Sequence, residues 1–262
     1  MARGATSSPG TGMGLRGPRA GRSRGAPARA GAGGSGGSGV RLYGSPGSRS
    51  PLVNWYLHEV DVAFEVVPPA DPSNPHPMGQ VPALRDDAGG GDVAVFESGA
   101  ILAYLGDRYG GLDTPGARAD VTKWLVWANA TLDPCLFKET PQGRVIGTGV
   151  TSREPQRPLL ALEAHLAEGG EGGPFVLGET FSAADCAIVA YCMYVLQFFN
   201  EANYAAYPNI AAYAKRCVER DGYRRAFGPQ VTEVLLQKLE ADIAGLSLKQ
   251  ARKQGLFDTL FK

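Results

Sequence analysis

The sequence GQVPALRDDAGGGDVAVFESGAILAYL, residues 79–105, combines the signals of two strands and one helix. Its β-prone residues fall into two short runs, Val81–Leu84 and Val93–Phe96, and a polar segment with three consecutive glycines separates the runs. Two such runs around a glycine-rich turn are typical of a β-hairpin, so we expect the strands to pair antiparallel. Behind the second run, apolar residues from Ile101 to Leu105 follow the spacing of one helix face. The stretch therefore predicts a hairpin that leads into a helix.

The start of this helix and the start of the hairpin both offer backbone groups to a ligand. Ser98 stands where the helix N-cap is expected, and the unpaired N–H groups of a helix N-terminus attract anions such as carboxylates. Pro82 follows Val81, and a cis bond between them turns the Val81 N–H and C=O outward, where they can pair with an extended ligand. We therefore expect this stretch to hold a peptide-like anion at two points.

Upstream, the sequence predicts a β-α-β unit whose two strands lie parallel. The first strand is Val40–Tyr43, and a loop rich in glycine, serine and proline leads from it into a helix that begins near residues 48–50. The second strand is Phe64–Val67. The proline-rich segment 68–77 that follows is not expected to be helical.

Two motifs in this half, GQVPAL at 79–84 and FESGAI at 96–101, resemble the glutathione-binding half of the cytosolic glutathione transferases. The resemblance implies an α/β thioredoxin-like N-terminal domain followed by an all-α helical-bundle C-terminal domain, which together form the glutathione transferase fold. It also implies that the Val81–Pro82 bond is cis, that the Val81 backbone pairs with the cysteinyl part of glutathione, and that Glu97 and Ser98 hold its γ-glutamyl end.

The same resemblance leaves the glycine end of glutathione with two candidate partners. Gln80 has a family counterpart that donates to this end, although a residue beside Gly79 can equally be a plain turn residue. Family members commonly carry a basic residue for the glycine carboxylate in a longer segment upstream. Here that segment, 71–77, is short and proline-rich, and His76 is the candidate replacement, although an isolated histidine in a loop is usually only solvated.

The loop after the first strand carries the candidate catalytic residue. GSPGS at 44–48 matches the Gly-x-Pro-x-Ser pattern of the serine-type (phi, tau and zeta-like) classes, which implies that Ser48 stabilises the glutathione thiolate. A hydroxyl hydrogen bond and a helix N-terminus can together lower the pKa of a thiol from its usual value of about 8.5. Ser50 is the main alternative because it precedes Pro51 and is itself a good N-cap, and Ser45 is another.

The cysteine positions restrict the chemistry further. Reductases of this fold use a cysteine in the same loop to form a mixed disulfide, but no cysteine occurs before Cys135, so the first domain lacks that nucleophile. Conjugation or thiol-dependent isomerisation is therefore favoured. The four cysteines also show no C-x-x-C spacing, which argues against a zinc site or a disulfide framework.

The sequence predicts helices for the C-terminal half. Apolar residues recur at helical spacing in 121–132, 159–166 and 210–218, and the motif FSAAD at 181–185 predicts a capping box between Ser182 and Asp185 at the start of a buried helix. We expect the acceptor site to be lined by the helix that holds Trp124, Trp127 and Asn129 and by the C-terminal segment. The predicted domains are 1–39, a disordered transit peptide and linker; 40–110, the thioredoxin-like domain; 111–118, a linker; 119–228, the all-helical domain; and 229–262, a helical extension.

Charge and composition set limits on partners and location. Lys+Arg and Asp+Glu both number 26, which gives no general attraction to nucleic acid, and no apolar run is long enough to span a bilayer. Residues 1–39 contain arginines but no acid and no aromatic residue, a composition typical of an organellar transit peptide. A plastid location is predicted, with the mitochondrion and the cytoplasm as alternatives; an unrelated low-complexity extension would also have this composition.

The sequence thus favours a homodimeric glutathione S-transferase that uses glutathione as co-substrate, needs no metal and conjugates a small hydrophobic electrophile. Two alternatives stay open. The fold also serves as a non-catalytic ligand carrier or scaffold module in translation complexes. The same thiolate could also support an isomerase or a dehalogenase.

Overall fold

The computed structural model describes residues 39–169 and 171–245, which belong to one compact unit. The predicted transit peptide and linker, 1–39, lie outside the described residues except for Gly39, and so does the segment 246–262 of the predicted extension. In the described part of the chain, no helix has the length and apolar character needed to cross a membrane.

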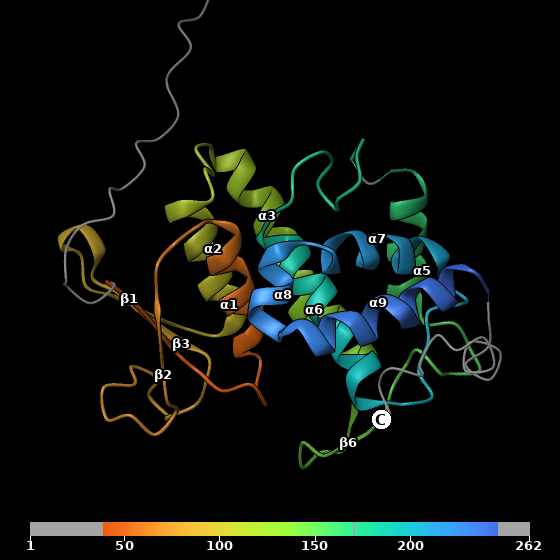
Figure 1. Cartoon of the computed structure of the whole chain (residues 1–262), viewed down its shortest axis with the longest axis horizontal. Helices are drawn as coiled ribbons and strands as arrows, with labels where there is room; N and C mark the ends of the chain where they lie inside the picture. Colours follow the sequence, from red (N-terminus) through yellow and green to blue (C-terminus); the bar gives the residue numbers. More distant parts are fainter. Residues whose placement is uncertain (1–38, 170, 246–262) are drawn as a thin grey trace, which may run out of the picture. The chain divides into compact units, whose positions relative to one another are not determined.

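The N-terminal half is a four-stranded sheet with helices α1 and α2 on the face turned toward the C-terminal helices (Figure 1). Its elements are, in chain order, β1 Val40–Tyr43, α1 Ser50–Glu59, β2 Glu65–Val67, β3 Ala83–Asp86, the 3-10 turn η1 Ala88–Gly90, β4 Val93–Phe96 and α2 Ser98–Tyr109. The strand order is β2-β1-β3-β4, with β1 parallel to β2 and β3 antiparallel to both of its neighbours. The predicted β-α-β unit, hairpin and thioredoxin-like fold are confirmed.

The C-terminal half is mainly helical, as predicted. Its helices are α3 Pro115–Trp127, the π-helical turn η2 Ala128–Leu132, α4 Asp133–Leu136, α5 Arg157–Ala167, α6 Ala183–Phe198, α7 Pro208–Val218, α8 Asp221–Phe227 and α9 Pro229–Ile243. Helix α3 begins inside the segment 111–118, because Thr114 accepts the Ala117 N–H and caps it. One cluster of buried apolar side chains extends from β1 and α1 to α9 and includes most of α6.

The capping box at the start of α6 is confirmed. The Ser182 N–H and hydroxyl both donate to Oδ2 of Asp185, at 2.8 and 2.9 Å. Asp185 is fully buried, and its Oδ1 accepts from the Val176 N–H and the Tyr213 hydroxyl, at 2.9 and 2.7 Å. The carboxylate therefore stabilises the end of the buried helix and the loop before it.

The structure corrects two expected helix caps. Ser98 is the first helical residue of α2, and the N-cap position belongs to Glu97, whose φ of 69° and ψ of 123° turn the chain sharply from β4 into the helix. Ser50 is likewise the first residue of α1, after Arg49 at the N-cap position. The prediction of a cap at Ser98 is wrong. The chain already turns at Glu97, so Ser98 has a helical conformation and not the extended one of a serine cap.

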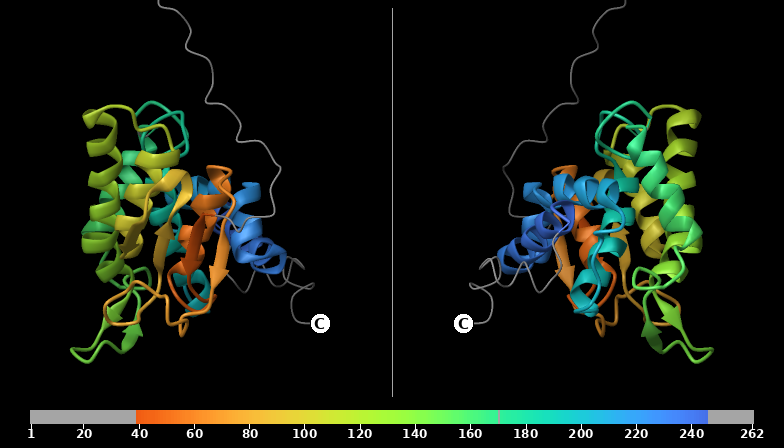
Figure 2. Two further views of the ribbon diagram at one scale, coloured as in Figure 1. Left: turned by 90° about the vertical axis from the view of Figure 1, so that its left-hand side faces the viewer. Right: turned by 90° about the vertical axis from the view of Figure 1, so that its right-hand side faces the viewer.

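A short hairpin in the C-terminal half was not predicted. Strands β5 Lys138–Glu139 and β6 Val145–Gly147 follow α4 and project away from the helices (Figure 2). Strands of two and three residues contain too few positions for an alternating pattern to be recognised. The hairpin matters for function because it reaches the cavity described next.

Candidate active site

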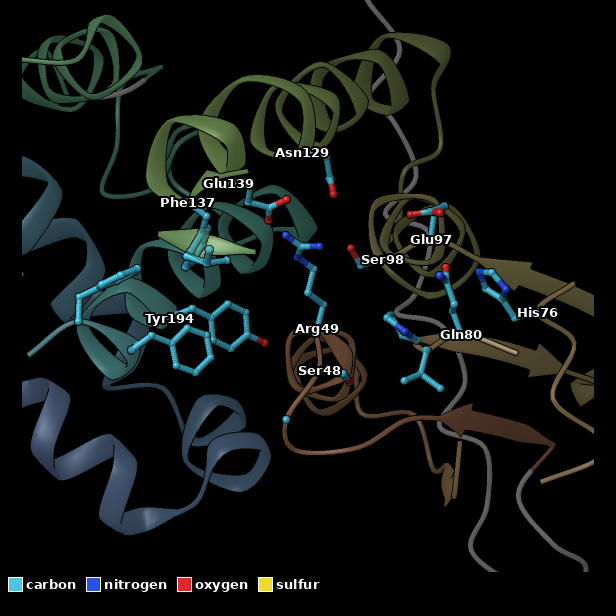
Figure 3. Close-up of a pocket in the computed structure, with 16 residues that line it drawn as sticks. Ser48, Arg49, His76, Gln80, Glu97, Ser98, Asn129, Phe137, Glu139 and Tyr194 are labelled. Atoms are coloured by element: carbon cyan, nitrogen blue, oxygen red, sulfur yellow. The ribbon is translucent and has the colours of Figure 1, made fainter. Parts of the chain in front are cut away.

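A cavity of about 630 Å³ lies between the N-terminal and C-terminal halves (Figure 3). The N-terminal half supplies Gly47, Ser48, Arg49, His76, Gln80, Val81, Pro82, Glu97 and Ser98 to its wall. The C-terminal half supplies Asn129, Phe137, Glu139, Val145, Tyr194, Phe198 and Phe199. The wall from the N-terminal half is thus mainly polar, while the wall from the C-terminal half is largely aromatic.

All the residues predicted to bind glutathione line this one cavity. They are Ser48, Gln80, Val81, Pro82, Glu97 and Ser98. The alternative serine, Ser50, is only 4% exposed and does not line it. Segments that are up to 50 residues apart in the chain therefore meet at one place, because the sheet brings the loop after β1 next to the start of β3 and the end of β4.

Three serines form a hydrogen-bonded cluster at the start of α1. The Ser48 hydroxyl lies 2.8 Å from the Ser45 carbonyl oxygen, to which it can donate, and 2.6 Å from the Ser50 hydroxyl oxygen. The Ser50 N–H donates to the Ser48 oxygen at 3.1 Å. Ser48 faces the cavity, and Ser50 supports it from behind. If Ser50 donates its own proton to Ser48, the Ser48 proton is left for a sulfur atom in the cavity.

The start of β3 has the backbone expected for binding an extended ligand. The Val81–Pro82 bond is cis, as predicted. Val81 makes no backbone hydrogen bond to another described residue. Val81 also lines the cavity, so its N–H and C=O are available to a ligand there.

The start of α2 lies beside the start of β3, because β4 pairs with β3 and Phe96 is the register partner of Ala83. No side chain caps its first turn, so the N–H groups there carry the partial positive charge of a helix N-terminus. Ser98 is 5% exposed, and its hydroxyl is 3.4 Å from that of Tyr191. The conformation of Glu97, which costs about 1–3 kcal/mol for a residue other than glycine, aims its side chain along the cavity wall (Figure 3).

A polar network that sequence reasoning missed joins the two halves beside these groups. Arg49 donates to both carboxylate oxygens of Asp133, at 2.7 and 2.6 Å, and its guanidinium lies 5.3 Å from the centre of the Tyr191 ring. Burial alone would lower the pKa of Arg49, but Tyr191 and Asp133 raise it overall. The Tyr191 hydroxyl donates to Asn129 at 2.7 Å. Arg49 is therefore a fixed cation at the cavity wall.

His76 and Gln80 both lie at the end of the cavity near Glu97 (Figure 3). The Met78 N–H donates to Nδ1 of His76 at 3.1 Å. Because Nδ1 accepts this bond, the proton of a neutral His76 ring sits on Nε2, which can donate to an anion. The loop histidine is not solvated, since it is only 6% exposed and its ring packs against that of Phe96.

The aromatic wall differs from the expected acceptor site. Trp124 and Trp127 pack against each other and against the core, with Trp124 also beside His165, and neither lines the cavity. Only Asn129 of the three residues expected on that helix does. The aromatic residues of the wall come instead from the end of α6 and from Phe137 at the end of α4, and the unpredicted hairpin adds Glu139 and Val145. The aromatic residues at 194, 198 and 199 could have indicated this wall, but the sequence of a long apolar helix does not show which of its ends is open to a ligand.

Comparisons with known proteins agree with this arrangement. The family profile "Glutathione S-transferase, N-terminal domain" matches residues 38–107, and the profile "Glutathione S-transferase, C-terminal domain" matches 156–216, together half of the chain. Glutathione S-transferase GstB of Escherichia coli is 29% identical over 163 residues, which cover 57% of this chain and 74% of that protein. Elongation factor 1-gamma of Danio rerio is 28% identical over 159 residues, 58% of this chain and 34% of that protein.

Solved structures show the same fold. A glutathione transferase family member from Pseudomonas fluorescens, with two glutathione bound, superposes with a TM-score of 0.57 at 23% identity and covers 72% of this chain and 92% of that one. The glutathione transferase URE2P8 from Phanerochaete chrysosporium, with oxidized glutathione, gives a TM-score of 0.55 at 19% identity, over 74% of this chain and 96% of that one. With both family profiles matched in the expected order on the expected fold, the chain belongs to the glutathione S-transferase family.

Proposed function

We propose that the protein is a glutathione transferase that conjugates the glutathione thiolate to a small hydrophobic electrophile. One observation carries the proposal: a single cavity holds all six residues assigned to glutathione and, opposite them, an aromatic wall. A tripeptide and an apolar acceptor can therefore occupy it together. The glutathione found in the Pseudomonas fluorescens neighbour supports the choice of co-substrate.

The residues of the polar wall suit the parts of glutathione. The Val81 backbone would pair with the cysteinyl unit, Glu97 and the first turn of α2 with the γ-glutamyl ammonium and carboxylate, and Gln80 or His76 with the glycine carboxylate. In this orientation the sulfur points toward Ser48 and the start of α1. Each of these contacts joins a charged ligand group to a partner of suitable charge or hydrogen-bonding capacity.

The proposed reaction needs little from the protein beyond a stable thiolate. The thiol gives its proton to solvent, and the Ser48 hydroxyl and the N-terminus of α1 stabilise the anion. The sulfur then attacks an electrophilic carbon in the aromatic half of the cavity. A C–S bond forms while a leaving group departs with its electron pair, or, in an addition, the electron pair of a double bond shifts and later takes a proton.

Binding and turnover measured together test this proposal. We expect retention on immobilised glutathione, heat on titration with glutathione, and thioether formation from a chromogenic aryl halide. Glu97→Ala should weaken glutathione binding at least tenfold, because Glu97 lines the cavity, whereas Glu179→Ala, which changes an exposed acid elsewhere, should not. Absence of heat and of retention would refute the proposal.

A scaffold or carrier role is the second candidate, favoured by the similarity to elongation factor 1-gamma. It predicts no thioether formation. Binding of glutathione without turnover of any electrophile would select a carrier. An isomerase or dehalogenase that uses the same thiolate predicts glutathione-dependent turnover of a different acceptor.

Three finer points belong to the same proposal. The enzyme would be of the serine type, form a homodimer and be imported into a plastid under the direction of residues 1–39, whose arginine-rich, acid-free composition supports import. Light scattering on the full chain tests the dimer. Imaging of the full chain fused to a fluorescent protein tests the location; diffuse cytoplasmic signal would contradict it.

A further inference from the structure

Glu139 is an acidic residue of the cavity wall that the proposed binding of glutathione does not use. It belongs to strand β5, is exposed, and lines the cavity. Its carboxylate forms no hydrogen bond or close ion pair with another described residue, and its charge reaches Arg49 and Asp133 only at longer range. The basic residues of the same hairpin, Lys138 and Arg144, do not line the cavity. The Glu139 carboxylate is therefore available to a ligand.

The other charges of the cavity already have partners. Arg49 is the one Lys or Arg among the described residues that line it, and its Nη2 donates to both carboxylate oxygens of Asp133, at 2.7 and 2.6 Å. Glu97 is assigned to the ammonium group of glutathione, whose two carboxylates and thiolate leave the bound tripeptide with a net negative charge. Glu139 adds to this charge. Because a cleft with charges of one sign attracts ligands of the opposite sign, the acceptor half of the cavity favours a cation.

Aromatic rings lie next to this carboxylate. Phe137 stands two residues before Glu139, and both line the cavity (Figure 3). The centre of the Phe137 ring is 6.4 Å from that of Phe198 and 6.3 Å from that of Phe199, and Phe198 is 64% exposed. The faces of aromatic rings attract cations, and groups of such rings bind quaternary ammonium ligands. Exposed ring surface beside an unpaired carboxylate therefore suits an ammonium group whose methyl groups contact the rings.

We propose that the acceptor site takes electrophiles that carry a cationic group such as a quaternary ammonium, held by Glu139 and the rings of Phe137 and Phe198. This inference rests on the proposed conjugating function and narrows its acceptor to an apolar body with a positive charge. With an aryl chloride of this kind, the thiolate sulfur bonds to the ring carbon that carries the chlorine, and chloride then leaves with the electron pair of its bond. The cationic group takes no part in these bond changes; it holds the ring in place.

Two substrates of equal shape test the inference. Both are aryl chlorides activated by two nitro groups, and opposite the chlorine one carries a CH2–N(CH3)3+ group and the other a CH2–C(CH3)3 group. Each kcat/KM is divided by the rate constant of the same compound with glutathione alone, which removes the difference in intrinsic reactivity. For the wild type we expect the corrected ratio, cationic over neutral compound, to be about 5–20.

Three variants locate the source of this preference. Glu139→Gln keeps the size of the side chain but removes its charge, and it should lower the ratio about three- to fivefold. Phe198→Leu keeps an apolar side chain without a ring face, and it should lower the ratio about two- to fivefold. Glu154→Gln is the matched control, because Glu154 is another exposed acid but lies outside the cavity wall. Its ratio should equal that of the wild type.

Each result bears on a defined claim. A preference for the cationic compound that falls in Glu139→Gln and in Phe198→Leu, but not in Glu154→Gln, supports the inference. A wild type without this preference, a ratio that Glu139→Gln or Phe198→Leu leaves unchanged, or an equal fall in Glu154→Gln overturns the inference and leaves the transferase function standing. Failure of the wild-type protein to convert either substrate overturns both.

Discussion

The Ser48 hydroxyl can donate its proton to the Ser45 carbonyl, to the Ser50 hydroxyl or to a bound thiolate. Which acceptor it uses determines whether it can stabilise the thiolate. The Ser45 carbonyl oxygen lies 2.8 Å from the Ser48 hydroxyl oxygen. A thiolate is a charged acceptor and forms a stronger hydrogen bond than a neutral carbonyl. The serine should therefore redirect its proton to the sulfur when glutathione ionises, while the Ser50 N–H continues to hold the Ser48 oxygen.

We predict that Ser48→Ala raises the pKa of bound glutathione toward the value of about 8.5 for a free thiol. The pH profile of kcat/KM should shift to higher pH. The rate at neutral pH should fall by about 10–100-fold, because a rise of one to two units in the thiol pKa lowers the amount of thiolate by that factor. The ultraviolet absorbance of bound thiolate against pH measures the shift directly. Ser50→Ala is the control; the Ser48 assignment fails if this variant loses the thiolate while Ser48→Ala keeps it.

A second prediction at this scale concerns stability. Tyr194→Phe removes a hydroxyl that is buried without a partner, so the free energy of unfolding should stay constant or rise by about 1 kcal/mol. Tyr213→Phe should instead destabilise by about 1–3 kcal/mol, because its hydroxyl donates to the buried Asp185. Urea unfolding curves measure both. A large loss of stability in Tyr194→Phe would show that its hydroxyl has a structural partner.

At the scale of elements, helix α9 carries a pH-sensitive attachment. Asp242, near its end, is 2% exposed and accepts the Tyr204 N–H at 2.7 Å. Burial raises the pKa of Asp242 from 3.8 to about 6, against the opposing effects of the Tyr204 N–H and Lys238. The folded protein therefore binds this proton more tightly than the unfolded chain does.

The sign of the effect follows from that difference. Between pH 4 and 6 the folded state holds more of the proton, so this residue's contribution to stability is complete below about pH 4 and is lost as the pH rises through about 6. The loss corresponds to about 3 kcal/mol, at 1.36 kcal/mol for each pKa unit. Asp242→Asn keeps an acceptor for the Tyr204 N–H without charge. We expect this variant to match the wild type near pH 4 and to exceed its stability at pH 7; equal stabilities at both pH values would contradict the prediction.

The elements also show what sequence could and could not predict. The hairpin, the β-α-β unit and the Ser182–Asp185 capping box each depend on signals within a few residues, and all three are confirmed. The β5–β6 hairpin is too short to leave a pattern, and the π-helical turn at 128–132 has no local signature. The same holds for the site. The serine loop and the start of β3 could be recognised from local motifs, whereas the places of Arg49 and Tyr194 in the site depend on contacts between the two halves.

At the scale of the whole molecule, the Glu59–Arg220 ion pair joins the two halves, in addition to the Arg49–Asp133 pair at the cavity wall. Glu59, the last residue of α1, accepts from Nε and Nη2 of Arg220, at 3.0 and 2.6 Å, and from the Trp55 ring N–H at 2.9 Å. The Glu59 side chain is 9% exposed. The guanidinium also lies 4.1 Å from the centre of the Phe181 ring. Gly222 in α8 presses against the carboxylate, since a Cβ there would lie 2.4 Å from a Glu59 oxygen.

This junction and the shared core predict that the halves unfold together. Arg220→Met leaves the Glu59 carboxylate buried with only Trp55 as a partner, which should cost about 3 kcal/mol. Glu59→Gln combined with Arg220→Met should cost less than the sum of the two single changes, because the double variant leaves no unpaired charge.

Far-ultraviolet circular dichroism reports all helices, and tryptophan fluorescence reports Trp55 in one half and Trp124 and Trp127 in the other. The two urea transitions should coincide in the wild type and shift together in Arg220→Met, since one hydrophobic cluster contains side chains of both halves. Separate transitions would mean that the sheet and the helices are independently stable and that the cavity between them opens before either half unfolds.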